Sequence, residues 1–212
     1  YSASFDELFL ENKKAWDCIC KKIDIRVDGR RLVQKLIRLN LYHSMITASP
    51  HNANIDAGIP ARGLHGEAYR GHIFWDELFV FPLFNLRMPE ITRALLRYRY
   101  RRLDEARKAA QAAGYQGAMY PWQSGSDGRE ETQLVHLNPK SGNWLPDNSH
   151  LQRHINSALV YNIWQYYQVT RDLQFLSFCG AEMILEIARF WASMTSYNEQ
   201  RDRYEILGVM GP

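Results

Sequence analysis

The sequence predicts an all-α protein made of helical hairpins with functional loops at one end, which favours an α/α toroid. Most of the 212 residues follow the three-to-four spacing of apolar side chains that is typical of amphipathic helices. Strand and helix patterns do not alternate, which excludes a doubly wound sheet. Short turns instead alternate with long irregular stretches that carry aromatic and charged residues. The absence of a strict repeat disfavours a solenoid.

Two helices are predicted first, over residues 5–23 and 30–48. Ser4 is the expected N-cap of the first helix, and Glu7 completes a capping box. The second helix carries an amphipathic stripe that contains Leu36. Both helices therefore need an apolar partner surface.

A long irregular stretch over residues 48–71 separates these helices from an apolar segment over 73–86. A loop of that length in a compact domain is usually functional. The apolar segment predicts a buried helix that Pro82 kinks or ends. One strong helix is predicted over 89–114, where Gly114 forms the C-cap.

A second irregular stretch covers residues 115–149, and two helices follow over 150–172 and 173–197. Residues 203–212 predict a short strand that leads into a loop. The basic run at 97–102 is interpreted as a solvated helix face with some buried aromatic side chains, because no nucleic-acid-binding motif accompanies it.

Composition narrows the possible partners. The net charge is only +3, and 26 basic residues are interspersed with 23 acidic ones, so we expect no nucleic acid. No apolar run reaches the roughly 18 residues of a membrane span, so no membrane partner is expected. The first residues lack a signal-peptide pattern, and location stays open between cytoplasm and periplasm. The three cysteines are interpreted as ordinary, mostly buried thiols, with no metal site.

The strongest candidate for chemistry is the segment ARGLHGEAYRGHIFWDELF, residues 61–79. Trp75 and Asp76 are adjacent where the loop enters the apolar helix, and aromatic content is high at 13%. An indole face packs on the apolar face of a pyranose, and a carboxylate binds its hydroxyls. Alternatively, Asp76 accepts a hydrogen bond from Arg70 or His72 and only anchors the loop.

A second candidate is YPWQSGSDGREE, in which Trp122 and Gln123 repeat the combination of a stacking ring with a polar group. The neighbouring Glu130 and Glu131 are expected to be solvated. His150 and His154 are four residues apart on one helix face. Because no third zinc ligand is apparent, they are interpreted as a hydrogen-bonded polar pair.

The string GLHGEAYRGHIFWDELFVFP resembles glycoside hydrolase family 65, and the likeness continues through LLRYRYRRLDEARKAAQAAGYQGAMYPWQS, HINSALVYNIWQYYQVTRD and YEILGVMGP. This family includes maltose, trehalose and kojibiose phosphorylases and some hydrolases. The resemblance implies that residues 1–212 are a single helical domain, the first part of an (α/α)6 catalytic barrel. Residues 1–30 would be its helical lead-in.

The resemblance also implies site residues. The glucosyl-binding wall would comprise Arg70, His72, Trp75, Asp76, Trp122, Gln123 and His154. The general acid of the family is expected just after Pro212, so no catalytic residue is assigned within the chain. No cofactor or metal is implied, although inorganic phosphate would be a co-substrate of a phosphorylase.

The implied function is a part of an inverting enzyme that cleaves the α-glucosidic bond of a glucose disaccharide by hydrolysis or phosphorolysis. The segment WQSGSDGREETQ slightly favours hydrolysis. The chain alone would be inactive, and its apolar faces would be covered by the rest of the barrel or by self-association. The alternative is a helical module that binds carbohydrate or a protein partner without catalysis.

Overall fold

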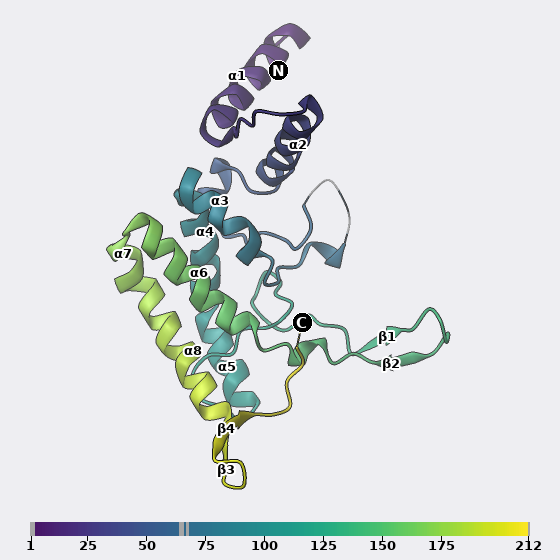
Figure 1. The fold of residues 1–212 in the computed structure, drawn as a ribbon, viewed down its shortest axis with the longest axis vertical. Coiled ribbons are helices and arrows are strands. Elements are labelled where there is room, and N and C mark those ends of the chain that lie inside the picture. The colour runs from purple at the N-terminus through teal and green to yellow at the C-terminus, as the bar shows by residue number, and fades with distance from the viewer. Residues whose placement is uncertain (1–2, 64–65, 67, 212) are drawn as a thin grey trace.

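A computed structural model describes residues 3–63, 66 and 68–211, and it confirms a mostly helical fold (Figure 1). Two short antiparallel hairpins are the only sheets among the described residues. The helices and strands are α1 (Phe5–Ile23), α2 (Arg31–Thr47), η1 (Pro50–Asn54), η2 (Tyr69–Gly71), α3 (Glu77–Arg87), α4 (Pro89–Tyr100), α5 (Leu103–Ala112), β1 (Val135–Leu137), β2 (Trp144–Pro146), η3 (Ser149–Leu151), α6 (Ile155–Thr170), α7 (Leu173–Phe175), η4 (Leu176–Gly180), α8 (Ala181–Met194), β3 (Thr195–Asn198) and β4 (Arg203–Ile206).

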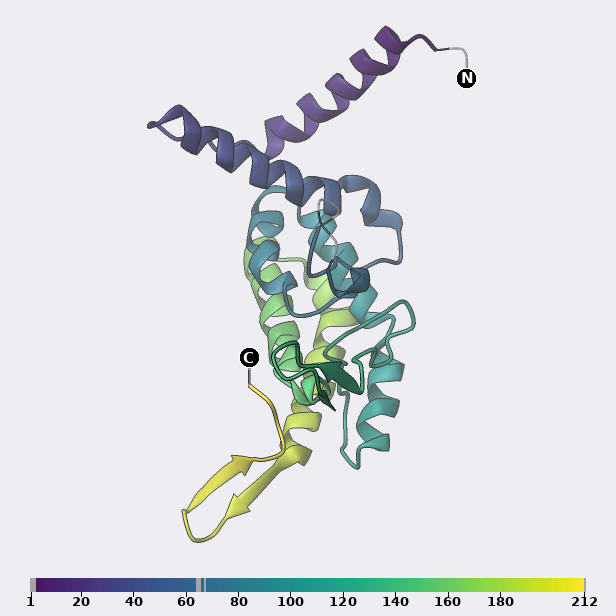
Figure 2. The same cartoon turned by 90° about the vertical axis from the view of Figure 1, so that its right-hand side faces the viewer.

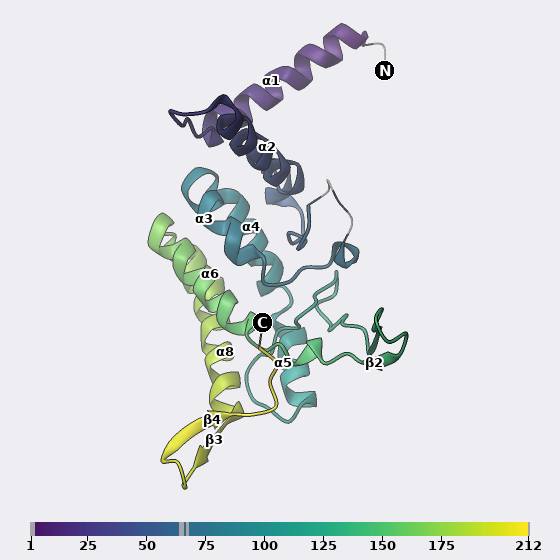
Figure 3. The ribbon, with the colours of Figure 1, turned by 45° about the vertical axis from the view of Figure 1, so that its right-hand side comes forward.

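The helices α3, α4, α6 and α8 form the body of the molecule, with α5 packed beside α8. Helices α1 and α2 extend from one end of this body (Figure 2). The β1–β2 hairpin projects from its side and the β3–β4 hairpin from the opposite end (Figure 3). In the hairpins Val135 lies opposite Pro146, and Thr195 lies opposite Ile206. The predicted strand near the end of the chain is thus confirmed as β4.

One hydrophobic core runs through the body and is centred on the packing of α3 against α6. Phe81 and Phe84 of α3 are fully buried, as are Leu159 and Ile163 of α6. Burial of a large apolar side chain stabilises the folded state by about 1.5–3 kcal/mol. This packing holds α3 helical through Pro82, where the sequence pattern alone suggests an interruption. The prediction that the helix ends there is wrong.

The α3 helix is also less buried than predicted. It begins at Glu77 rather than at residue 73, and Phe79 and Leu86 are 67% and 70% exposed. The other face of α3 therefore presents apolar side chains to solvent, in line with the expectation that part of the helical surface is left uncovered.

Helices α1 and α2 are held to each other mainly at one end. The predicted capping box is confirmed, since Ser4 Oγ accepts from the Glu7 amide and the Glu7 carboxylate accepts from the Ser4 amide. Asp24 receives two hydrogen bonds of 2.9 Å from Arg38. The apolar stripe of α2 is nevertheless open, and Leu32 is 65% exposed.

The predicted helix over 89–114 is interrupted between α4 and α5. The basic run there is only partly a solvated face, since Arg97 and Arg101 are exposed and Tyr98 is buried, as predicted, but the other two arginines are buried. Arg99 is 1% exposed and Arg102 is 8% exposed. The Arg102 guanidinium donates to Ser126 O and to Asp56 Oδ1, which ties the second irregular stretch and the segment after η1 to this corner. Gly128 (φ +84°) lies so close that a Cβ there would be 2.8 Å from Arg102 Cβ.

Two more predictions concern the cysteines and membrane-spanning helices. Cys18 and Cys20 are exposed and Cys179 is partly buried, so the expectation of mostly buried thiols is wrong. The reason is that α1 stands away from the helical body, and Cys20 lines the open cavity between α1 and α2. Within the described ranges, no helix is both long and apolar enough to cross a membrane.

A buried ion pair fixes the start of α3 relative to α4. The side chains of Glu77 and Arg99 are each 1% exposed. Arg99 Nη2 and Nε lie 3.1 and 3.2 Å from Glu77 Oε2, and Nη2 also donates to the carbonyl of Phe74 at 2.8 Å. Arg99 therefore holds both ends of the turn that contains Trp75 and Asp76.

Removal of Arg99 should be strongly destabilising. We expect Arg99→Met to lower the free energy of unfolding by about 3–5 kcal/mol, because Glu77 is left buried without its partner. Arg97→Met on the exposed face of α4 is the matched control and should change stability by less than about 0.5 kcal/mol. Urea unfolding of the complete protein measures both, and similar midpoints for the two variants would contradict a structural role for the pair.

Candidate sugar-binding site

The two candidate segments meet through a short backbone bridge. The amides of Ile73 and Ser124 each donate to the carbonyl of the other residue at 2.9 Å. Tyr98 of α4 supports the bridge through a hydrogen bond, since its hydroxyl lies 2.8 Å from Ser124 Oγ. Trp75 follows Ile73 by two residues, and Trp122 precedes Ser124 by two residues. The bridge therefore brings the two tryptophans together, with ring centroids 6.1 Å apart.

The carboxylate of Glu130 organises the second segment. It accepts hydrogen bonds from the amides of Trp122 (2.8 Å) and Gln123 (3.0 Å) and from both the amide and the hydroxyl of Thr132. Glu130 is exposed, as predicted, but its hydrogen bonds are made with the protein. It therefore acts as a local cap that keeps Trp122 and Gln123 in place.

The polar residues of the first segment bind the second segment. Gln123 Nε2 lies 2.7 Å from His72 Nδ1, and Arg70 Nη2 donates to the carbonyl of Glu131 at 3.3 Å. Neither Arg70 nor His72 is hydrogen-bonded to Asp76 in the described structure. The alternative in which Asp76 anchors the loop through these two residues is not supported.

These segments enclose a pocket of about 570 Å³. Five of the seven residues predicted for the sugar-binding wall line it, and they are Arg70, Trp75, Asp76, Trp122 and Gln123. Two predicted residues, His72 and His154, lie behind these side chains and do not line the pocket. Sequence reasoning missed seven polar or aromatic lining residues, which are Tyr69, Phe74, Thr132, Gln133, Asp147, Ser149 and Gln152.

Most of the missed residues lie just before the β1–β2 hairpin or in the turn after it, whereas Tyr69 and Phe74 belong to the first segment. Gln133 Nε2 donates to Asp147 Oδ2 at 3.1 Å, and the Asp147 amide donates to the carbonyl of Leu134 at 2.9 Å. Asp147 also accepts from the amide of Ser149, which makes an Asx turn. Nothing in the string Asp-Asn-Ser indicates that this turn lines the same pocket as Trp75.

The two pocket carboxyls have opposite electrostatic environments. Burial raises the pKa of Asp76, and a hydrogen bond from the backbone offsets only part of this effect. Burial would also raise the pKa of Asp147, but hydrogen bonds from Ser149 and Gln133 outweigh it and hold that pKa below its usual value. Asp76 thus has spare capacity to accept hydrogen bonds from a ligand, whereas Asp147 is already bound to the protein.

The histidine pair differs from the prediction. No hydrogen bond joins His150 to His154 in the described part of the chain, so a hydrogen-bonded pair is wrong. The His154 ring instead packs against both indoles, with centroids 4.7 Å from Trp75 and 4.9 Å from Trp122. Among the residues described, no group of three or more histidine, cysteine or acidic side chains could hold a metal ion.

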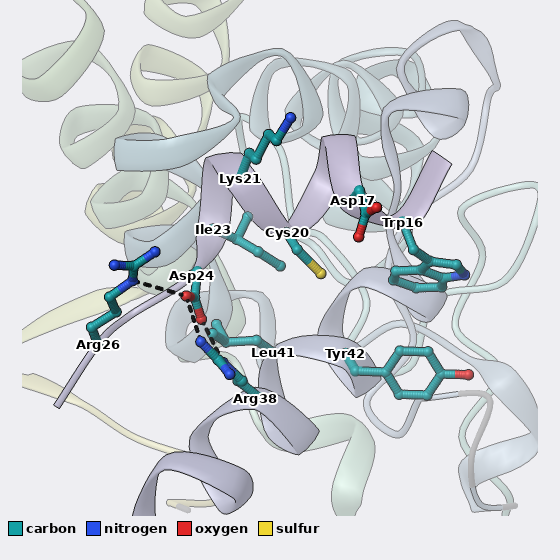
Figure 4. A pocket seen from close by; sticks show the side chains of 10 residues that line it. All are labelled: Trp16, Asp17, Cys20, Lys21, Ile23, Asp24, Arg26, Arg38, Leu41 and Tyr42. Carbon is teal, nitrogen blue, oxygen red and sulfur yellow. Dashed lines mark hydrogen bonds and ion pairs between the residues drawn. The ribbon is translucent and has the colours of Figure 1, made fainter. Parts of the chain in front are cut away.

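A larger cavity, of about 680 Å³, lies between α1 and α2 (Figure 4). Trp16 and Tyr42 stand at one side of it with ring centroids 4.8 Å apart. Its central carboxylate, Asp24, is already bound by Arg38 and lies 3.7 Å from Arg26, and hydrogen bonds from Arg38 hold the pKa of Asp24 below its usual value. A second carboxylate, Asp17, also lines this cavity, but the residues predicted for the sugar-binding wall gather at the pocket that holds Trp75 and Asp76.

Comparison with known proteins assigns the family. The model of the glycosyl hydrolase family 65 central catalytic domain matches residues 38–212. The chain belongs to glycosyl hydrolase family 65. It is 54% identical over 208 residues to an uncharacterized glycosyl hydrolase of Mycobacterium tuberculosis strain CDC 1551, covering 98% of this chain and 16% of the relative.

Other relatives of this family 65 chain have named activities. It is 42% identical over 214 residues to the trehalose 6-phosphate phosphorylase of Lactococcus lactis, which covers 100% of this chain and 28% of that enzyme. The structure of a putative kojibiose phosphorylase from human microbiome superposes with a TM-score of 0.83 at 30% identity, over 99% of this chain and 26% of that one. The chain therefore spans under a third of the length of these relatives.

The backbone beside the pocket is strained. Tyr69, Arg70 and Gly71 have successive φ values of 55°, 55° and 71°. Only glycine adopts this left-handed region without penalty, and strain of this kind is concentrated at functional sites. The turn presents both Tyr69 and Arg70 to the pocket.

A glycine at position 70 should affect the stability of the protein and its affinity for a glucoside in opposite directions. Arg70→Gly should raise the free energy of unfolding by about 0.5–1 kcal/mol, because the left-handed penalty is removed while unfolded-state entropy rises. It should also weaken glucoside binding, because the guanidinium is lost from the pocket. Arg171→Gly is the matched control, since Arg171 has φ 56° at the C-cap of α6 and does not line the pocket.

Both glycine variants should gain similar stability, measured by thermal unfolding of the complete protein. Isothermal titration with a glucoside should show weakened binding for Arg70→Gly alone. Unchanged binding in that variant would make the strained turn a purely structural feature.

The opposite pKa directions of the two carboxyls predict opposite pH effects. A carboxyl with a raised folded-state pKa opposes folding increasingly as pH rises above its unfolded-state pKa, and fully above the folded-state pKa, so Asp76→Asn should raise thermal stability near pH 7. The gain should shrink toward about pH 4, where the unfolded carboxyl is protonated. Asp147→Asn, with a lowered pKa in the parent, should reduce stability near pH 7, and this loss should also fade in acid.

Thermal unfolding of the complete protein at several pH values measures both effects. Equal shifts of the same sign for the two variants would contradict the assignment of distinct environments to Asp76 and Asp147.

Proposed function

We propose that this chain is part of the catalytic domain of an inverting enzyme that cleaves α-glucosidic bonds by phosphorolysis. The pocket that holds Trp75, Asp76 and Trp122 supports a glucosyl-binding role, because it combines two indole faces with a carboxylate free to accept hydroxyl hydrogen bonds. The named relatives favour phosphorolysis over the hydrolysis that the 122–133 segment slightly favoured, since they are phosphorylases of trehalose 6-phosphate, kojibiose and glucosylglycerol.

The helices would form the first part of an (α/α)6 barrel, with residues 1–30 as its lead-in. The open apolar surfaces of α2 and α3 support this, because they need a covering surface. The remaining helices of the same barrel would cover them.

In the proposed mechanism the glucosyl group binds against the two tryptophans while Asp76 accepts its hydroxyls. A general acid after Pro212 protonates the glycosidic oxygen as the bond to C1 breaks. A phosphate oxygen attacks C1 from the opposite face, which yields β-glucose 1-phosphate and the free acceptor. The described residues contribute orientation and exclusion of water rather than proton transfer.

The backbone supports this division of roles. After β4 the chain turns back toward the start of α6, where the Met210 amide donates to the carbonyl of Leu151 at 3.0 Å (Figure 1). Residues beyond this point would therefore begin next to the helix that carries His154. That is a suitable approach for a general acid at the sugar-binding wall.

The test is turnover by the complete protein on kojibiose, trehalose, trehalose 6-phosphate and maltose, with and without phosphate. We expect β-glucose 1-phosphate from at least one substrate and only in the presence of phosphate. Asp76→Asn should lower kcat/KM by at least about tenfold through lost sugar orientation. Glucose release without phosphate would show a hydrolase, and glucoside binding without turnover would favour the non-catalytic module.

A further inference from the structure

A second, smaller cavity, of about 250 Å³, lies between α5 and residues 119–130, and we call it the α5 cavity. Its charged lining residues are Glu105 and Lys108 of α5, Arg129 and Glu130 of the second irregular stretch, and Arg153 just before α6. Within the described ranges, no residue lines both this cavity and the sugar-binding pocket. The α5 cavity is therefore a separate site.

Arg153 is the charged residue of this cavity that has no protein partner. Its Nε is buried without a hydrogen-bond partner, and its guanidinium forms no ion pair among the residues described. Burial lowers the pKa of Arg153, and attraction to the Glu130 carboxylate opposes this only in part. An arginine nevertheless stays charged at neutral pH, and a partly desolvated charge without a partner is unfavourable. The guanidinium thus has donors to offer to a ligand.

The two carboxylates of the cavity are already bound. Glu130 accepts the amides of Trp122 and Gln123 at 2.8 and 3.0 Å, so its two oxygens serve the wall of the sugar-binding pocket. Glu105 Oε1 lies 2.6 Å from Lys108 Nζ. Three basic and two acidic side chains line the cavity, which leaves an excess of one positive charge. That excess favours an anionic ligand.

The backbone that carries Arg153 is fixed by the core. The Arg153 amide donates to Leu151 O at 2.9 Å, and its carbonyl accepts from Asn156 Nδ2 at 3.0 Å. Asn156 is fully buried and also accepts from the amide of Tyr120 at 2.8 Å. The guanidinium therefore starts from a rigid backbone, which reduces the ordering entropy that a ligand must overcome.

We propose that the α5 cavity binds a phosphoryl group through the Arg153 guanidinium, with Arg129 and Lys108 at its rim. The planar fork of N–H donors on a guanidinium matches the oxygens of a phosphate, and the two further cations suit a dianion. The cavity is smaller than the roughly 300 Å³ at which pockets for drug-sized ligands begin, so the phosphoryl group alone would fill it. The proposal concerns a site apart from the sugar-binding pocket and does not depend on the proposed function.

The experiment is isothermal titration of the complete protein with inorganic phosphate. Arg153→Gln removes the charge and the fork of donors. Arg97→Gln is the matched control, because Arg97 is exposed on α4 and lines neither the α5 cavity nor the sugar-binding pocket. One phosphate site per chain should be at least about tenfold weaker in Arg153→Gln and unchanged in Arg97→Gln, because charge-assisted hydrogen bonds are lost.

The number of sites separates this proposal from the proposed function. If the protein is a phosphorylase, its co-substrate phosphate gives a further site that is common to the parent and both variants. If it is not, the parent should bind one phosphate per chain. In either case Arg153→Gln should lose one site, and equal numbers and affinities in the parent and Arg153→Gln would overturn the proposal.

The phosphoryl group has two sources, free phosphate and a phosphate monoester, and a second titration distinguishes them. Glucose 6-phosphate is the probe for a monoester, and glucose is its uncharged control. Tighter Arg153-dependent binding of glucose 6-phosphate than of phosphate would support a sugar phosphate as the ligand, and the reverse order would support free phosphate. A parent protein that binds neither compound would contradict the proposal.

Thermal unfolding gives an independent measurement. Without phosphate, Arg153→Gln should unfold at the same or a higher temperature than the parent, because an unpartnered charge is removed. Added phosphate should raise the unfolding temperature of Arg97→Gln as much as that of the parent, and that of Arg153→Gln by less. If Arg153→Gln fails to fold, the exposed Arg129→Gln decides, since loss of a rim charge should weaken phosphate binding about three- to fivefold. Unchanged affinity in Arg129→Gln would then count against the site.

Discussion

The whole site depends on one buried guanidinium. Arg99 crosses from α4 to the turn before α3, where it binds Glu77 Oε2 and the carbonyl of Phe74. Glu77 Oε1 and Arg99 Nη1 are buried without hydrogen-bond partners in the described ranges, so the pair is incompletely satisfied. Buried pairs of this kind add little net stability over an apolar core. The Glu77–Arg99 pair instead fixes the conformation of the turn that precedes α3, and this turn carries Trp75 and Asp76.

Given that fixed turn, the rest of the wall is built mainly by hydrogen bonds to the backbone. The bridge between Ile73 and Ser124 is made by backbone groups and is supported by the Tyr98 hydroxyl at Ser124 Oγ, and the Glu130 carboxylate holds the amides of Trp122 and Gln123. Loops are normally the mobile part of a fold. Here the tryptophans are carried by loop backbone that is tied at each end, which keeps the ligand-facing side chains in place before a sugar binds.

The sequence was informative where one strong local signal decides the structure. Apolar periodicity located the helices, the capping box located the start of α1, and the adjacency of Trp75 and Asp76 located the pocket. Prediction from the sequence failed where contacts between residues that are distant in the sequence determine the structure. The run at 97–102 looked solvated because Arg is usually exposed, yet Glu77 and Asp56 supply buried or half-buried partners for Arg99 and Arg102.

The same reasoning explains the missed pocket residues. Gln133 and Asp147 are fourteen positions apart and meet only because a hairpin brings them together. Tyr69 reaches the pocket through a left-handed backbone that no residue preference predicts, since its neighbour Arg70 is equally unfavourable there. Pocket lining of this kind follows from tertiary structure, and single-sequence patterns do not contain it.

The residues that line the proposed sugar-binding pocket contribute to it unequally. The pocket holds aromatic faces, amides and carboxyls. Asp76, the carboxyl with the raised pKa, has no side-chain hydrogen-bond partner among the described residues. A group with spare hydrogen-bonding capacity gains most from a ligand, because sugar hydroxyls replace the water that burial has removed. The unfavourable burial of Asp76 is therefore offset only when the pocket is filled, which couples local stability to occupancy by the sugar.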